Sequence, residues 1–118
     1  MPSNLVHMAT TGSAARWERL AATLADADIH TNVDTTNYPG GRSYSITLHY
    51  PGIGNICIHD AWWRKNADIW IGWQVWAEDR EGITLKEWPL TKKRSEVVAA
   101  VRGAQRCYDT VQAEEEVR

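Results

Sequence analysis

The sequence predicts one α+β domain, with an antiparallel meander sheet of four or five strands between an N-terminal and a C-terminal helix. Apolar residues recur at helical spacing near both ends of the chain, and they alternate with polar residues at strand spacing in the middle. The 118 residues are enough for one hydrophobic core. We expect the order α-β-β-β-β-α, with both helices on one face of the sheet and the other face open to solvent or a partner.

The first helix is expected to begin at Ser13, because serine is a favourable N-cap. Its buried face is predicted by residues at the i, i+3, i+4, i+7 spacing: Trp17, Leu20, Ala21 and Leu24. The helix should end within residues 26–28. Residues 1–12 are polar and hold several Ser and Thr, so we interpret them as a flexible arm before a single domain at 13–113.

The middle of the chain predicts the sheet. The expected strands are residues 29–36, 43–50, 56–60, 69–77 and 83–88. The first is polar and suits an edge of the sheet. In the second, the inward side chains would be Tyr44, Ile46, Leu48 and Tyr50. The loop at 79–82 is expected to be a three-residue hairpin turn, with Gly82 in the left-handed conformation.

Thr91 is expected to cap the last helix. The apolar stripe of this helix comprises Val97, Val101, Ala104, Tyr108 and Val111. Residues 114–118 are mainly acidic, and we expect this tail to fray.

Tryptophan is concentrated in residues 60–76, which hold five of the seven in the chain. The odd positions of the strand at 69–77 are all apolar, so Trp73 is predicted to lie in the core. Trp70 and Trp76 occupy even positions and are predicted to face away from the helices. Unbroken alternation would bury Asp60, so we expect a β-bulge near this residue, which leaves the faces of Trp62 and Trp63 unassigned.

The hairpin register predicts that Trp88 lies on the same outer face. The predicted cross-strand pairs are Asp79–Ile83, Ala77–Leu85 and Trp76–Lys86. Ile83 and Leu85 would then face the core. Lys86 and Trp88 would face outward, with the lysine over an indole ring.

Several tryptophans on a face that no helix covers predict a surface for protein binding, because large exposed apolar patches mark contacts. The expected contact residues are Trp70, Trp76, Lys86, Trp88 and Trp63. Two alternatives are that the rings pack on one another as a minor cluster, or that they are buried in a homodimer.

The basic residues Lys92, Lys93 and Arg94 stand at the start of the last helix, where the helix dipole disfavours cations. One explanation is a bound phosphate or other anion. The preferred explanation is an exposed first turn, or pairing with Glu87 and Glu96. The phosphate explanation, combined with base stacking on Trp, predicts nucleic-acid or nucleotide binding as the alternative function. The net charge of −2 makes nucleic acid the less favoured partner.

The order of elements resembles that of the double-stranded-RNA-binding domain, in which lysines that open the last helix lie over phosphates. Lys92 and Lys93 correspond to these lysines. The chain departs from that family at residues 51–55, which read PGIGN in place of a Gly-Pro-His-type loop, and in its larger number of strands.

His49, Cys57 and His59 are expected on the outward face of adjacent strands, and all three carry atoms that bind zinc. Their spacing matches no standard site and no fourth ligand is evident, so we predict no metal and no cofactor. Cys57 and His59 also lack an oxyanion site and a third positioned group. The prediction is therefore that the protein is not an enzyme.

No apolar run approaches the roughly eighteen residues that span a bilayer. Residues 1–16 lack the basic and apolar regions of a secretory signal. The two cysteines indicate no disulfide framework. We therefore expect a cytoplasmic protein with no membrane partner.

Two segments, DAWWRKNADIWIGWQVWAEDREGI at 60–83 and PLTKKRSEVVAAVRGA at 89–104, resemble small accessory proteins of actinobacterial phages. The resemblance covers about the second half of the chain. It implies a protein with no catalytic residues that binds a host protein in the host cytoplasm and modulates host processes or defence.

Overall fold

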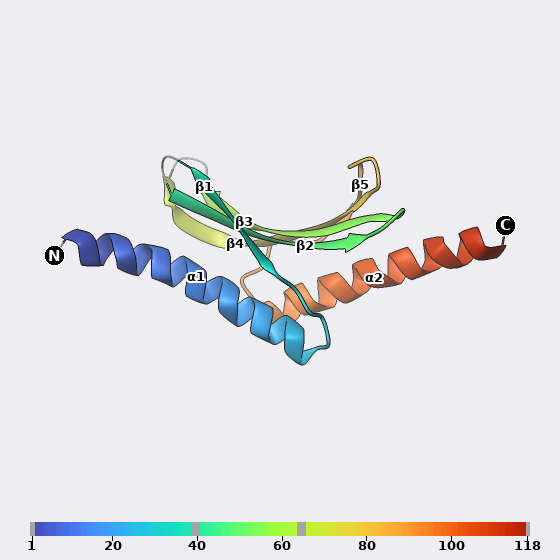
Figure 1. The fold of residues 1–118 in the computed structure, drawn as a ribbon, viewed down its shortest axis with the longest axis horizontal. Helices are drawn as coiled ribbons and strands as arrows, with labels where there is room; N and C mark the ends of the chain where they lie inside the picture. Colours follow the sequence, from blue (N-terminus) through green and yellow to red (C-terminus); the bar gives the residue numbers. More distant parts are fainter. Residues whose placement is uncertain (1, 39–40, 64–65, 118) are drawn as a thin grey trace.

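The computed structural model describes the backbone of residues 2–38, 41–63 and 66–117, and the side chains of residues 13–37, 42–63 and 69–114. Its elements are α1 (Pro2–Asp26), β1 (Val33–Tyr38), β2 (Gly41–Tyr50), β3 (Gly54–Trp63), β4 (Asn66–Asp79), β5 (Thr84–Glu87) and α2 (Arg94–Val117). The strands form one antiparallel sheet in the order β1-β2-β3-β4-β5. Both helices lie on one face of this sheet, so the predicted α+β layout is confirmed (Figure 1).

Helix α1 begins at Pro2, so the predicted arm is helical and Ser13 is not its N-cap. Proline suits the first helical position because the N–H that it lacks has no partner within the helix there. Gly12 adds a propensity cost of only about 1 kcal/mol, which does not stop the helix. At the other end of the chain, α2 continues to Val117 through most of the predicted fraying tail.

The predicted C-terminal end of α1 is confirmed. Asp28 takes the left-handed conformation at φ 62°, and its N–H donates to Ala25 O at 2.9 Å. The N–H of Ile29 donates to Leu24 O at 2.8 Å, which completes a Schellman motif. Ile29 is itself buried and therefore ties the end of the helix to the core.

The core lies between the helices and the inner face of the sheet. Trp17, Leu20 and Leu24 of α1 are fully buried, as the helical spacing predicted. The other buried core residues include Tyr44, Ile46, Ile56, Ile58, Trp73, Val75, Ala77, Val97, Ala100, Val101, Ala104 and Tyr108. The rings of Trp17 and Trp73 meet edge to face with centroids 6.3 Å apart. The prediction that Trp73 is a core residue is thus confirmed.

Asp60 faces the core side of the sheet, which the predicted bulge was expected to prevent. Its Oδ2 accepts a hydrogen bond from Trp17 Nε1 at 2.8 Å, and its Oδ1 accepts one from Trp70 Nε1 at 2.8 Å. The two indole donors allow a carboxyl group to be partly buried there. The irregularity expected near Asp60 and Ala61 begins directly after them, since Ala61 pairs with Gly72 but Trp62 pairs with Trp70, and the register shifts again between Trp62 and Trp63.

A register shift between β4 and β5 separates the pairs Glu78–Thr84 and Ala77–Lys86, so that Leu85 has no cross-strand partner. The predicted pairing therefore holds next to the turn, but Ala77 pairs with Lys86 in place of Leu85, and Trp76 pairs with Glu87 in place of Lys86. The loop itself is as predicted, because Gly82 has φ 84° and the N–H of Asp79 donates to Ile83 O. Ile83 and Leu85 are 60% and 54% exposed, so the prediction that they face the core is wrong.

Candidate functional site

Trp70 lies on the helix-covered face of the sheet, contrary to the prediction. Its ring meets that of Trp73 edge to face at 4.9 Å, and the Arg16 guanidinium of α1 lies 3.9 Å from its centroid. The cause is the register shift, which leaves Ile71 as an extra residue in β4 and reverses the facing of Trp70. Ile69, which the alternation placed in the core, is 49% exposed.

Trp88 also lies on the helix side, contrary to the prediction. Its N–H donates to Val75 O at 3.0 Å, and its ring covers Gly103 of α2, where an added Cβ would be 3.2 Å from Trp88 Cζ2. The Lys86 ammonium lies 5.2 Å from the centroid of the Trp88 ring. The predicted contact of Lys86 with an indole is therefore present, but at the seam between β5 and α2.

Of the three tryptophans predicted for the outer face, Trp76 alone lies there. It pairs with Cys57 across β3 and β4, and its ring centroid is 4.7 Å from that of His59. Trp63 is 52% exposed at the far end of β3, and the adjacent Trp62 is 37% exposed. The predicted continuous tryptophan surface on the outer face therefore does not form.

The outer face instead carries polar side chains around Cys57. His49 Nδ1 lies 2.6 Å from Asn55 Oδ1, and Asn55 Nδ2 donates to Glu78 Oε1 at 3.3 Å. Burial, followed by the negative charge of Glu78, raises the pKa of Cys57 to about 12. Burial also lowers the pKa of His59. Among the residues whose positions are described, no three or more His, Cys, Asp or Glu side chains gather closely enough to hold a metal ion.

The thiols of Cys57 and Cys107 should differ in how fast they react with a thiol reagent. In the native protein at mildly alkaline pH, a thiol reagent should label the exposed Cys107 quickly and the buried Cys57 slowly. The Cys107→Ser variant should lose the fast phase, whereas Cys57→Ser should keep it, and denaturant should expose the remaining thiol in both variants. Fast labelling that persists in Cys107→Ser would contradict the burial of Cys57.

A concave surface with several apolar residues lies between the β4–β5 hairpin and α2. It is a cleft of about 320 Å³ lined by Gly52, Ile53, Asp79, Arg80, Glu81, Leu85, Tyr108 and Val111. We call it the β5–α2 groove. Leu85 and Val111 are its exposed apolar side chains, and residues 79–81 form a charged rim. The register shift leaves Leu85 without a cross-strand partner, and its side chain lines the cleft beside Tyr108 and Val111 of α2.

Tyr108 forms the floor of the groove and is 1% exposed. Its hydroxyl lies 2.8 Å from Asn55 O and 2.6 Å from Glu78 O, so its proton is shared between two strand carbonyls. One helical turn further along, Val111 is already 37% exposed. The C-terminal part of α2 projects past the end of the sheet (Figure 1).

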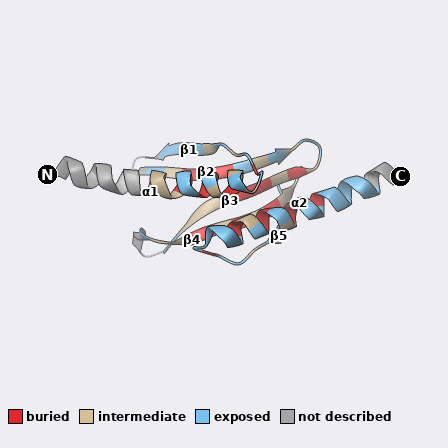
Figure 2. Ribbon diagram, turned by 90° about the horizontal axis from the view of Figure 1, so that it is seen from below, coloured by how far each residue is buried: buried red, intermediate tan, exposed pale blue. Residues whose placement is uncertain are grey.

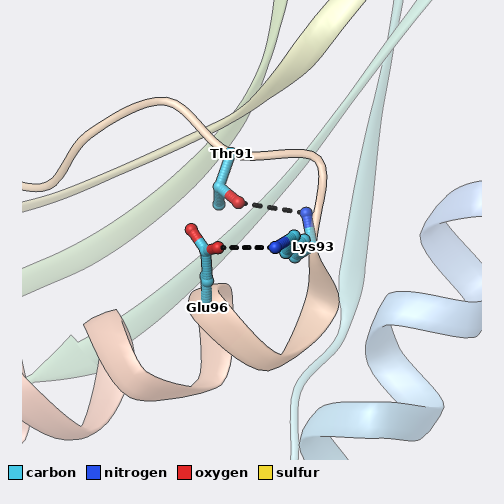
Figure 3. Close-up of polar contacts among 3 residues, drawn as sticks. All are labelled: Thr91, Lys93 and Glu96. Carbon is cyan, nitrogen blue, oxygen red and sulfur yellow. Dashed lines mark hydrogen bonds and ion pairs between the residues drawn. The ribbon is translucent and has the colours of Figure 1, made fainter.

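The basic residues Lys92, Lys93 and Arg94 line a second, more open cleft of about 450 Å³ with Ser95 and with Thr23 of α1. Thr91 Oγ1 accepts a hydrogen bond from the Lys93 N–H at 3.0 Å, in the turn that leads into α2 (Figure 3). The Lys93 ammonium lies 3.7 Å from Glu96 Oε1, which confirms part of the predicted pairing (Figure 3). A phosphate bound by these cations stays a prediction.

No protein-family model, curated protein or solved structure was found to match this chain. No helix in the described part of the chain is long and apolar enough to cross a membrane.

Proposed function

We propose that this chain is a non-enzymatic module that binds a protein partner through the β5–α2 groove. The observation that supports this function best is the pair of exposed aliphatic side chains, Leu85 and Val111, in a cleft whose floor is the buried Tyr108. Ile83, two residues before Leu85 in the chain, is also exposed, at 60%. Burying such side chains stabilises a complex by roughly 25 cal/mol per Å² of apolar area before ordering costs.

The seam beside the groove adds two residues from the predicted contact set. Trp88 is partly buried against α2, and the Lys86 ammonium lies over its ring. Tryptophan is enriched among the residues that dominate binding energy at protein interfaces. Trp76 and Trp63 lie elsewhere on the sheet, and Trp70 is engaged with Asp60 and Arg16, so these three are not part of the proposed surface.

The chemistry of the outer-face thiol supports the non-enzymatic part of the proposal. A cysteine with a pKa of about 12 is protonated at neutral pH, and the thiol form is a poor nucleophile. The resemblance to phage accessory proteins suggests a host protein as one class of partner, and a second copy of the chain is another.

The proposal is tested by placing a photoreactive amino acid at position 85 in the full chain, expressed in the cell of origin. We expect a discrete crosslinked product, identified by mass spectrometry, that is lost when Val111→Asp is added. The matched control carries the same probe at Thr47, an exposed position on the outer face. Equal crosslinking at both positions, or none at position 85, would contradict the groove as a binding surface.

A further inference from the structure

Leu90 is an exposed apolar side chain that stands beside the cations at the start of α2. It is 44% exposed and is followed by Thr91, which is buried, and then by Lys92, Lys93 and Arg94, which are all exposed. The main chain is held there because Thr91 and Trp73 exchange backbone hydrogen bonds of 2.7 and 3.1 Å. This segment, which we call the Leu90 projection, is therefore held against β4 and presents one partly exposed apolar side chain and three positive charges.

The β5–α2 groove has the opposite character. Its apolar floor and wall, Ile53, Leu85 and Val111, match an inserted leucine, and its rim carries Asp79 and Glu81 against the single cation Arg80. Glu114, one turn beyond Val111, is exposed and adds a further negative charge. The Leu90 projection and the β5–α2 groove are thus complementary, because each has an apolar part and they carry opposite charges.

A two-fold axis would satisfy both contacts at once. Along the sheet edge, the position halfway between Leu85 and Leu90 falls at Glu87 and Trp88. Along α2, the position halfway between its basic start at 92–94 and its Val111–Glu114 end falls at Gly103. Trp88 and Gly103 are in contact with each other, so both sequence midpoints lie at the seam between β5 and α2. In an isologous interface each copy contributes the same two patches, so the Leu90 segment of one copy faces the groove of the other.

The geometry points to a second copy of this chain as the occupant of the groove, with the Leu90 projection of each copy inserted into the groove of the other. This inference rests on the proposed function, since it names the partner of the same groove. The α2 helices of the two copies lie antiparallel, and Trp88 and Lys86 stand near the axis. Each basic helix start then meets the acidic helix end of its partner, which relieves the unfavourable helix-dipole interaction at both ends.

The available surface suits such a dimer. A stable interface buries about 800 Å² on each partner, roughly a tenth of the 8172 Å² surface of this chain. The 24 residues of α2 span about 36 Å at the usual helical rise. Helix α2 and β5 run along one long edge of the molecule, and no described element lies beyond them (Figure 2).

The test is sedimentation velocity on the purified full chain over a wide concentration series at low salt. The mass should rise with concentration from the 13.4 kDa monomer to twice that value and no further. Leu90→Asp places a charge at the inserted side chain and should raise the dimer dissociation constant by at least about tenfold. Circular dichroism on each variant verifies that the exposed substitutions leave the fold intact.

A charge swap gives a readout that a folding defect would not mimic. Lys92→Glu and Glu81→Lys should each weaken the dimer, whereas the chain that carries both substitutions should regain it, because the paired charges are inverted together. Glu18→Lys, an exposed reversal on α1, is the matched control and should have no effect.

A monomer at every concentration would overturn the second copy as occupant, and crosslinking from position 85 to another protein would still stand. Because the proposed dimer covers position 85, an intact dimer that gives no crosslink from this position would overturn both this interface and the groove as a binding surface. A dimer whose dissociation constant is unchanged by Leu90→Asp and by the charge swap would overturn this interface. Oligomers that grow beyond two copies would overturn the two-fold arrangement.

Discussion

Alanine in place of Gly72 is expected to lower the free energy of unfolding by about 3 kcal/mol or more. Gly72 has φ 139°, which L side chains rarely adopt, and an added Cβ would lie 2.7 Å from the Thr91 carbonyl oxygen. The methyl group would therefore push residue 91 away from β4. The Trp73–Thr91 hydrogen bonds hold this segment and set where α2 begins, so their loss would loosen the helix as well.

Gly82→Ala is the matched control for this prediction. Gly82 also has a positive φ, 84°, but an added Cβ would meet nothing within 4 Å. Its replacement should cost only the conformational penalty of about 1 kcal/mol. Urea denaturation followed by circular dichroism compares the two variants. If Gly72→Ala is no more destabilising than Gly82→Ala, the close approach of Thr91 to β4 is wrong.

The second large effect is expected at Asp60, where alanine should lower the free energy of unfolding by about 2 kcal/mol at neutral pH. The substitution leaves the Nε1 donors of Trp17 and Trp70 without their acceptor. Trp17 is fully buried, so water cannot readily replace the carboxylate there. The loss is partly offset, because a carboxylate is itself unfavourable in a partly buried site.

The Asp60→Asn variant and the pH dependence of stability separate the loss of the two hydrogen bonds from the cost of burying a carboxylate. Asparagine keeps the shape but offers one acceptor oxygen to two donors, so it should also destabilise, by less than alanine. Burial raises the pKa of Asp60 above its usual 3.8, although the two indole hydrogen bonds and Arg16 oppose this shift. Because the raised pKa favours the protonated form in the folded state, its contribution to stability is present below pH 3.8 and is lost as pH rises through the folded pKa.

The measurement is thermal unfolding of the wild type and Asp60→Asn across the acidic range. The stability difference between them should change in that window and become constant above it. A difference that does not vary with pH would mean that the pKa of Asp60 is the same in the folded and the unfolded chain, which would contradict its raised pKa. Unfolding free energies equal to wild type for both Asp60 variants would contradict the two indole hydrogen bonds.

Apart from Ile83 in the hairpin turn, the residues that the alternation pattern misplaced lie beyond a register shift or have a distant polar partner. Trp70 is turned inward because Ile71 is an extra residue in β4. Lys86 and Trp88 are turned inward because Leu85 is an extra residue in β5. A glycine inside a strand pattern often marks a bulge, so Gly72 was a signal that could have placed the first shift. The inward Asp60 had no local signal, since its partners Trp17 and Trp70 come from other elements.

The sequence by itself determined the α+β class, the sheet order that follows from short connections, and the inner faces of both helices, β2 and β3. These depend on periodicity within single elements, which burial against one core enforces. Only the tertiary structure decided which tryptophans face the helices, where Leu85 points, and hence that a groove lies between β5 and α2. Strand facing has a period of two, so one extra residue reverses every side chain beyond it. The position of that residue depends on contacts between distant segments, such as Thr91 against Gly72, which no local pattern encodes.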